Sequence, residues 1–333
     1  MDGLGATRPD GGLAAASAVP GLPPSPQALF GDLPLVRLRL GLEMAGRGGL
    51  SEHLGSALRG VFGWELQRLV CPFPRRPACA SCVIRRQCPY VQLLEDGSTL
   101  PGLADTPRPY GISSERGGPG IRLTVTLFGR ACAQAPVVVA AFAAGGRRGL
   151  GRRRLPYRLL AVEALLPGGG TRPLPLAAET LPPLVGPAPL AVWLETSPPA
   201  GPVCLRLLTP LRLRRQGKYL GAFDGPFLLE TTARRLEALH VLHHGGSPVP
   251  AAVRDQLRAL FATFVPEGVA LRWQDLVRQS SRQPGRQPLG GLVGTVRARI
   301  EPAIGAWLAA ASLAGAGKGT VMGLGRLAVE AAE

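Results

Sequence analysis

Alternating apolar and polar residues predict strands in both halves of the chain. In residues 36–40, apolar and basic positions alternate, which is typical of a strand with one buried face. The same two-residue period recurs in residues 121–128 and 203–213. Together with shorter apolar runs, the pattern predicts strands over residues 33–42, 121–128, 155–166, 203–213, 269–273, 289–300 and 327–329.

Apolar residues at helical spacing predict the helices. Positions 54, 58, 61, 62, 66 and 69 form one stripe, which predicts a helix over residues 51–70 with Ser51 as its N-cap. Gly55, Gly60 and Gly63 each cost up to about 1 kcal/mol inside a helix, so we expect another segment to pack close to this backbone. Further apolar segments predict helices over residues 136–144, 226–244, 251–264 and 303–313.

The order of these elements repeats once along the chain. Each half ends in a small apolar helix, a loop rich in Gly and Arg, and a strand; the two loops are residues 145–154 and 315–326. A repeat at this scale predicts an α+β protein of two tandem ferredoxin-like, or RRM-like, βαββαβ domains. The predicted strands lack the stacking aromatic residues of an RRM, which favours RNA binding by loops and grooves.

The length of 333 residues allows two domains of ordinary size. We expect ferredoxin-like domains at residues 27–199 and 200–333, joined within the proline-rich residues 167–202. Residues 1–26 are rich in Gly, Ala and Pro and lack the basic start of a secretory signal, so we expect a disordered leader. No uninterrupted apolar run reaches the length of a membrane span, and we expect a cytoplasmic protein without membrane association.

The net charge of +16 favours a polyanionic partner, chiefly nucleic acid. Only Lys218 and Lys318 are lysines, so 36 of the 38 basic residues are arginine. A coding bias toward GC adds arginine without selection for it. An excess of 16 over the acidic residues is more than such a bias readily gives.

Four cysteines, Cys71, Cys79, Cys82 and Cys88, lie within 18 residues. In a cytoplasmic chain such a cluster favours metal ligands over disulfides. It predicts a cysteine-rich insertion at residues 71–90 with a structural zinc site of four thiolate ligands; an iron–sulfur cluster would use the same ligands. Four reduced thiols in a loop are the alternative.

The glycine-rich residues 315–326 fail the test for a nucleotide P-loop. That motif needs a Gly five residues before its Gly-Lys pair and a Ser or Thr after the Lys, where this chain has Ser312 and Gly319. Glycines at this density still allow a backbone to approach phosphate closely, and a flexible turn is the alternative. We expect the loop to hold an RNA backbone through Gly317, Gly319, Gly323, Gly325 and Arg326.

Four blocks of residues occur in an order typical of one family. They are Leu-Arg-Gly-Val-Phe-Gly at residues 58–63 with the cysteine cluster behind it, Leu-Thr-Pro-Leu-Arg-Leu at 208–213, the segment 278–294 beginning Arg-Gln-Ser-Ser-Arg-Gln, and Gly-Lys-Gly-Thr-Val-Met-Gly-Leu-Gly-Arg at 317–326. In these blocks the chain resembles the CRISPR-associated endoribonucleases of the Cas6 type, within the RAMP superfamily. It departs from their pattern at Leu327, where an aromatic residue is more usual.

The resemblance implies metal-independent cleavage of precursor CRISPR RNA within its repeats, with no cofactor required for catalysis. A ribose 2′-OH attacks the adjacent phosphate and leaves a 2′,3′-cyclic phosphate and a 5′-OH. The implied partners are the repeat RNA, the crRNA product and other Cas proteins of an interference complex. The alternative function is a related crRNA-binding RAMP subunit without cleavage activity.

Such cleavage needs a base for the 2′-OH, a proton for the leaving 5′-oxygen and positive charge around the phosphate. Because family members often carry a catalytic histidine in this part of the chain, the resemblance implies His53 as the base; a solvent-facing helix residue is the alternative. We expect His240, His243 and His244 to cap a helix C-terminus rather than to catalyse. Lys318 is the second catalytic candidate, because a compact ammonium group suits contact with a developing charge.

Arginines in three loops are the predicted phosphate ligands, and a solvated surface charge is the alternative for each of them. They are Arg148, Arg152 and Arg153 in the first Gly/Arg loop, Arg278, Arg282 and Arg286 in the polar segment, and Arg326 in the second Gly/Arg loop.

Overall fold

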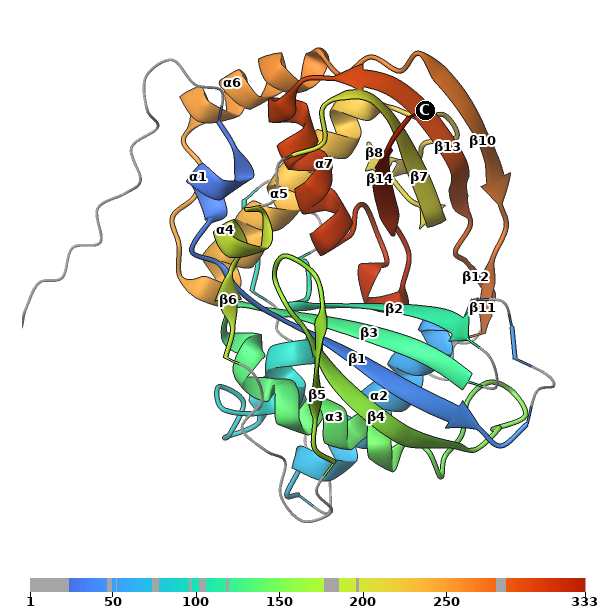
Figure 1. Cartoon of the computed structure of the whole chain (residues 1–333). Helices are drawn as coiled ribbons and strands as arrows, with labels where there is room; N and C mark the ends of the chain where they lie inside the picture. Colours follow the sequence, from blue (N-terminus) through green and yellow to red (C-terminus); the bar gives the residue numbers. More distant parts are fainter. Residues whose placement is uncertain are drawn as a thin grey trace, which may run out of the picture.

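The computed structural model folds the chain into two α+β lobes, one above the other (Figure 1). It describes residues 24–46, 50–51, 53–73, 78–95, 98–101, 106–117, 120–176, 186–195, 198–279 and 286–332, with the backbone alone at residues 278–279 and 286–287. None of the helices in these ranges is long and apolar enough to cross a membrane.

The lower lobe holds an antiparallel sheet in the strand order β2-β3-β1-β4-β5, with β6 paired to β1. Its strands are β1 (Pro34–Met44), β2 (Tyr110–Gly117), β3 (Gly120–Phe128), β4 (Tyr157–Leu165), β5 (Thr171–Leu174) and β6 (Ala188–Pro189). Helices α2 (Gly55–Val70) and α3 (Ala135–Ala144) cover one face of this sheet (Figure 1). The short helices of this half are α1 (Pro26–Phe30), η1 (Cys79–Ser81), η2 (Val91–Glu95), η3 (Gly129–Gln134) and α4 (Leu190–Trp193).

The upper lobe holds a second antiparallel sheet in the order β10-β13-β7-β14. Its strands are β7 (Gly201–Leu211), β10 (Gly268–Gln274), β13 (Gly291–Ile300) and β14 (Leu327–Ala331). Its helices are α5 (Gly225–His244), α6 (Ala251–Ala262), α7 (Pro302–Ala314) and the short η4 (Thr320–Met322). Two small hairpins join β8 (Arg214–Arg215) to β9 (Lys218–Tyr219), and β11 (Val277–Gln279) to β12 (Arg286–Pro288).

Both sheets follow one plan. Of the four main strands of each lobe, the second in sequence lies at an edge, followed across the sheet by the third, the first and the fourth. The predicted α+β class is confirmed, with antiparallel sheets in both halves. The loops at residues 145–154 and 315–326 follow α3 and α7 and precede the fourth strand of each lobe, at matching places in the two halves.

The first long helix departs from its prediction at its start. It begins at Gly55 rather than at residue 51, and the predicted N-cap at Ser51 is wrong. Leu54 is the N-cap residue, while Ser51 Oγ donates a hydrogen bond to His53 O (2.7 Å). Leu69 is 43% exposed, whereas the other five residues of the predicted stripe are buried.

The edge strand β2 is absent from the sequence-based prediction. Only Tyr110 and Ile112 of its eight residues are buried, and the others are Gly, Ser, Glu and Arg. Two apolar positions are too few to give a strand pattern. The strand forms because β3 supplies its hydrogen-bonding partner, with Ile112 opposite Val125.

Buried apolar residues form two clusters, one in each lobe. The upper cluster also takes Phe30, Leu33 and Leu35 from the start of the described chain and Leu190 from α4. Residues 1–23 of the predicted leader lie outside the described residues. The domain boundary at residues 199 and 200 stays a prediction.

Candidate functional site

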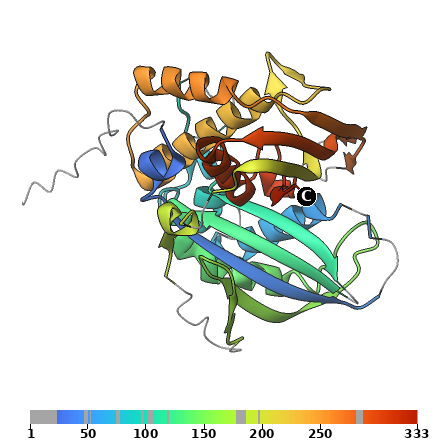
Figure 2. The same cartoon turned by 45° about the horizontal axis from the view of Figure 1, so that its top comes forward.

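The glycine-rich segment after α7 joins the two lobes. In Figure 1 it descends from α7 to the strands β2 and β3 before it turns into β14, and Figure 2 shows the upper sheet lying over the strands of the lower one. A Cβ atom on Gly55 would lie 1.8 Å from Met322 O, and one on Gly323 would lie 3.4 Å from Ile112 O. The start of α2, the edge strand β2 and the segment 315–326 therefore meet at one point.

This contact explains one of the three helix glycines. We expect a close neighbour at each of them, and Gly55 has one in the Met322 carbonyl. A Cβ on Gly63 would make an ordinary contact, 3.4 Å from a side-chain carbon of Leu94. A Cβ on Gly60 would meet nothing within 4 Å, so packing does not account for that glycine.

His53 lies at the meeting point, two residues before α2 rather than within it. Its Nε2 is 2.9 Å from Met322 O. Because a carbonyl oxygen only accepts, Nε2 carries the proton and donates, which leaves the lone pair on Nδ1. Burial lowers the pKa of His53 below its ordinary value of 6.5, against the opposing effect of the hydrogen bond to Met322. The imidazole is therefore a neutral base at neutral pH.

The segment 315–326 is a packed turn. Its glycines at 315, 317, 319, 323 and 325 all have positive φ, and a Cβ on Gly325 would lie 1.8 Å from Ala316 O. The backbone N–H groups of Gly323 and Gly325 already donate to Thr320 O (3.1 Å) and Pro210 O (3.0 Å). Glycine is thus required here for the fold itself, and the expected contacts of Gly317, Gly319, Gly323 and Gly325 with RNA stay predictions.

Lys318 lies in the same turn, partly buried. Its backbone N–H donates to Arg212 O (2.9 Å), and the lack of a side chain on Gly317 allows this approach, since a Cβ there would lie 2.5 Å from the same oxygen. The turn therefore fixes the Lys318 backbone beside the end of β7. The role of its ammonium group in catalysis stays a prediction.

A cleft of about 580 Å³ lies between the open face of the lower sheet and the upper lobe. Arg37, Arg39 and Arg122 line it from β1 and β3, and Arg326 lines it from the glycine-rich turn. Only Arg326 was among the predicted ligands. The alternation of apolar and basic residues in β1 could have indicated Arg37 and Arg39. When every second residue of a strand is buried, the basic residues between them must lie on the open face of the sheet.

The charges of the cleft are unevenly paired. Arg326 donates to Glu115 Oε1 (2.7 Å), and this hydrogen bond holds the pKa of Glu115 below its usual value, with Arg122 also nearby at 3.5 Å. Arg37 Nε is buried without a partner among the described residues. Burial lowers the pKa of Arg37 to about 10, with Arg326 and Arg39 adding repulsion, so the guanidinium remains charged at neutral pH.

Beside Arg37, the indole nitrogen of Trp193 is also buried without a partner in the described chain. The Arg37 guanidinium carbon lies 5.5 Å from the centre of the Trp193 ring, and both residues line the cleft. An unpaired buried donor is costly, so each of these groups favours a ligand that brings acceptor oxygens.

The other predicted arginines are spread over the molecule. Arg148, Arg152 and Arg153 lie in the loop after α3, where Arg152 and Arg153 are exposed. Arg278 and Arg286 lie in the hairpin of β11 and β12, which the structure describes by its backbone. Arg282 lies outside the described residues.

The three histidines of α5 tie the helix to other segments, and the helix is capped by Gly245 in a left-handed conformation. His240 Nε2 is 2.8 Å from Asp32 Oδ1, and His244 Nε2 is 3.4 Å from Asp32 Oδ2. His243 Nε2 donates to Pro107 O at 3.0 Å. The C-cap residue itself is Gly245, while His243 and His244 lie in the last turn as expected, and these contacts give the three side chains a structural role.

The cysteines surround the short helix η1. The Cys82 N–H donates to Cys79 O (3.4 Å), and Cys88 is buried in the lower core. Burial raises the pKa of Cys79, as do Glu95 and the thiols of the other three cysteines. In the described ranges no three potential ligands are gathered as a metal ion requires. The four-thiolate zinc site stays a prediction.

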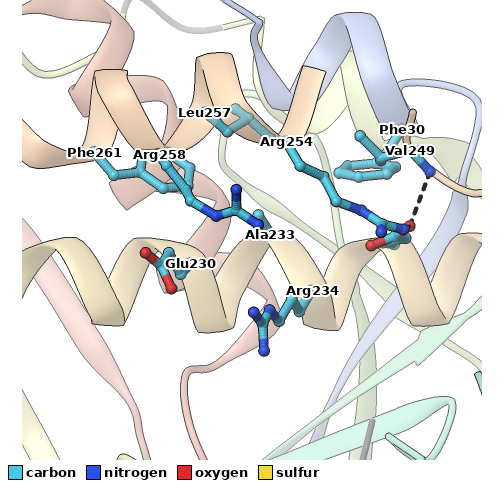
Figure 3. A pocket seen from close by; sticks show the side chains of 10 residues that line it. Phe30, Glu230, Ala233, Arg234, Val249, Arg254, Leu257, Arg258 and Phe261 are labelled. Atoms are coloured by element: carbon cyan, nitrogen blue, oxygen red, sulfur yellow. Dashed lines mark hydrogen bonds and ion pairs between the residues drawn. The ribbon is translucent and has the colours of Figure 1, made fainter. Parts of the chain in front are cut away.

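A second pocket, of about 50 Å³, lies between α5 and α6 (Figure 3). Its charged side chains are largely satisfied by the protein: Glu237 Oε1 accepts from Arg254 (2.7 Å) and from Val249 N (2.9 Å), and Arg258 pairs with Asp255. With Phe261 and Leu257 on its wall, this pocket is a packing seam between two helices.

The fold and the site define a two-lobed α+β protein with a basic cleft and a neutral histidine at the lobe junction. The family model of the CRISPR-associated endoribonuclease Cas6 matches residues 205–327, and a model described as the AF_1859 N-terminal domain matches residues 33–182. Over residues 205–327 the chain is therefore similar to the Cas6 family, and the solved structures given next share its fold.

Solved structures of Cas6 proteins share the fold over nearly the whole chain. Thermus thermophilus Cas6 (TTHB231) has a TM-score of 0.54 at 19% identity, over 90% of this chain and 99% of that one. Its product complex gives 0.55 at 19% identity, over 89% and 99%. The product complex of another Cas6 (TTHA0078) gives 0.52 at 22% identity, over 90% and 100%. No curated protein matches the sequence significantly.

Proposed function

We propose that this protein is an endoribonuclease that cleaves precursor CRISPR RNA within its repeats. The match of residues 205–327 to a family of such endoribonucleases supports this function. The observation that carries it is His53, a neutral base whose tautomer is set by the Met322 carbonyl where the two lobes meet. A histidine placed in this way suits proton abstraction from a ribose hydroxyl.

In the proposed reaction the ribose 2′-OH next to the scissile phosphate gives its proton to Nδ1 of His53. The 2′-oxygen forms a bond to phosphorus, the bond from phosphorus to the 5′-oxygen breaks, and the 5′-oxygen takes up a proton from the solvent. The products are a 2′,3′-cyclic phosphate and a 5′-OH, and no metal ion takes part. Lys318 would offset the negative charge that builds up on the phosphate.

The arginines of the cleft support RNA as the substrate. Arg37, Arg39 and Arg122 lie on the open face of the lower sheet, and the buried donors of Arg37 and Trp193 lack acceptors among the described residues. Phosphate and base oxygens are such acceptors. We propose that this cleft holds part of the repeat.

The shared strand order of the two sheets supports a tandem ferredoxin-like architecture, with domains at residues 27–199 and 200–333. In such a protein the cleft runs between two related units, and its walls are the open face of one sheet and the glycine-rich turn of the other unit. Partners of this site are the repeat RNA and, after cleavage, the Cas proteins of an interference complex that use the crRNA.

Incubation of the protein with end-labelled repeat RNA in EDTA tests this function. We expect one cut per repeat, a product with a 2′,3′-cyclic phosphate, and no cut when the scissile nucleotide carries a 2′-deoxy sugar. Tight binding without any cut would instead indicate a non-catalytic crRNA-binding subunit. A preference for duplex DNA over repeat RNA would contradict both functions.

A further inference from the structure

The loop after α3 presents a rigid basic turn. Leu150 and Leu155 exchange two backbone hydrogen bonds, of 2.8 Å and 3.0 Å, which close residues 151–154 into a tight turn. The closure needs glycine at position 149, since a Cβ there would lie 2.2 Å from Arg154 O. The three consecutive arginines at positions 152–154 are exposed at its tip. The turn therefore displays positive charge on a fixed backbone.

Next to this turn, the Arg148 guanidinium lies over the ring of Trp64. The guanidinium carbon is 3.6 Å from the centre of the indole ring, and Trp64 is 36% exposed on the outer side of α2. In the described chain Arg148 forms no ion pair with an acidic residue. The indole face holds the guanidinium close against it, and Arg guanidinium planes stack on nucleobases.

Gly60 precedes Trp64 by one helical turn on the same face of α2. It is exposed, and a Cβ at this position would meet nothing within 4 Å. A glycine in a helix interior weakens the helix relative to alanine, and no protein neighbour requires one here. It leaves the exposed helix backbone without a side chain at one position between the start of α2 and Trp64.

The helix α2 links the stack of Arg148 on Trp64 to the candidate cleavage site. His53 lies just before Gly55, the first residue of α2, and Trp64 lies nine residues further along the helix than Gly55. Nine residues rise by about 14 Å, at about 1.5 Å each. About four stacked nucleotides cover that distance at about 3.4 Å each.

We propose that Trp64, Arg148 and the basic turn at residues 151–154 form a subsite for the unpaired RNA segment that flanks the scissile phosphate. A base of that segment stacks on the outer face of the Arg148 guanidinium, and the RNA backbone passes over Gly60. The arginines at positions 152–154 contact the phosphates that follow. This inference rests on the proposed function, because His53 fixes the start of the path.

Single-stranded RNA fits these features better than a protein partner. The surface combines one aromatic–guanidinium stack with clustered exposed arginines. Stacking and phosphate contacts together are typical of sequence-tolerant binding to single strands.

The test measures the affinity for repeat RNA made uncleavable by a 2′-deoxy sugar at the scissile nucleotide. One version carries unpaired flanks on both sides, and others lack one flank or both. We expect Arg148→Ala to weaken binding of one of the two RNAs that keep a single flank roughly tenfold. Its affinity for the RNA without flanks should not change. Arg148→Lys should lose most of the same affinity, because it keeps the charge but not the stacking plane. Gly60→Leu should weaken binding of the flanked version only.

The control is Arg258→Ala, which removes one exposed arginine from α6. Equal affinities of wild type, Arg148→Ala and Arg148→Lys for every RNA would overturn the subsite, and so would an equal loss on flanked and trimmed RNA. Binding of an unstructured oligouridine distinguishes a wrong subsite from a wrong proposed function, because it does not depend on the CRISPR repeat. Even if the repeat is not the substrate, wild type must bind oligouridine several-fold more tightly than Arg148→Ala does, and melting temperatures must show that the variants are folded.

Discussion

At the scale of single residues, one hydrogen bond decides the form of His53. The Met322 carbonyl, 2.9 Å from Nε2, accepts only, so the proton of the neutral ring is on Nε2 and Nδ1 is basic. Partial burial disfavours the imidazolium and lowers the pKa. Burial thus favours the neutral form of histidine, which takes a proton, and the hydrogen bond to Met322 selects the tautomer with Nδ1 unprotonated.

The pH dependence of cleavage follows from this lowered pKa. The rate should rise with pH as His53 loses its proton, and the midpoint of that rise should lie below 6.5, the ordinary histidine value. Since the base form persists at a more acidic pH than in a free histidine, the rate should already be near its plateau at neutral pH. Single-turnover rates over the acidic and neutral range measure the midpoint, and a value at or above 6.5 would contradict the assignment.

At the scale of elements, the start of α2 depends on its contact with the glycine-rich turn. Gly55→Ala places a methyl group 1.8 Å from the Met322 oxygen and must displace the turn. We expect a loss of about 1–3 kcal/mol in the free energy of unfolding, typical of overpacking, and a lower cleavage rate. Denaturant unfolding and single-turnover cleavage measure the two effects.

Gly60→Ala is the matched control, since it makes the same change one and a half turns along the same helix in open space. It should stabilise the helix by up to about 1 kcal/mol. If both variants are equally stable and equally active, the lobe contact at Gly55 does not hold the site together.

The cysteine-rich element gives a separate prediction. If Cys71, Cys79, Cys82 and Cys88 hold zinc, purified protein should contain about one zinc per chain, and Cys79→Ser should lose the metal and lower the melting temperature. Cys132→Ser should keep the metal. Elemental analysis for zinc and iron decides the question, and metal-free protein of full stability would show the cysteines to be ordinary thiols.

At the scale of the whole molecule, the cleft predicts a steep dependence of RNA binding on salt. Each phosphate contact on a single strand contributes roughly 0.7 to the slope of log K against log salt. Arg39→Ala and Arg122→Ala should each reduce the slope by about that amount, while Arg258→Ala on α6 should not change it. Filter binding over a series of salt concentrations gives the slopes. Unchanged slopes in both cleft variants would exclude these arginines as phosphate ligands.

The sequence predicts much of this molecule because most of its elements bury one face. The strand β1 follows from its alternating pattern, and the helix α7 follows from its apolar segment. Tertiary contacts determine the features that the sequence pattern does not predict. The helix α2 begins at Gly55, which packs against the Met322 carbonyl, and β3 supplies the pairing that makes β2 a strand.

The candidate site, likewise, is only partly predictable from the sequence. The role of His53 is predicted by the resemblance to a family and not by any local sequence pattern. The glycine-rich turn is visible in the sequence, but its contact with His53 is not, since 269 positions separate His53 from Met322. Arg37 and Arg39 alternate visibly with buried leucines, yet a local pattern does not reveal that a second lobe closes over their open face.

The most direct test of the account is cleavage of repeat RNA by His53→Ala under single-turnover conditions with saturating protein. We predict a rate lower by about 10² to 10⁴, the range for loss of a general base, with RNA affinity within a few-fold of wild type. His244→Ala, which alters the contact with Asp32, should retain the full rate. Full cleavage by folded His53→Ala would contradict the central claim that the lobe junction at His53 and the glycine-rich turn is the catalytic site.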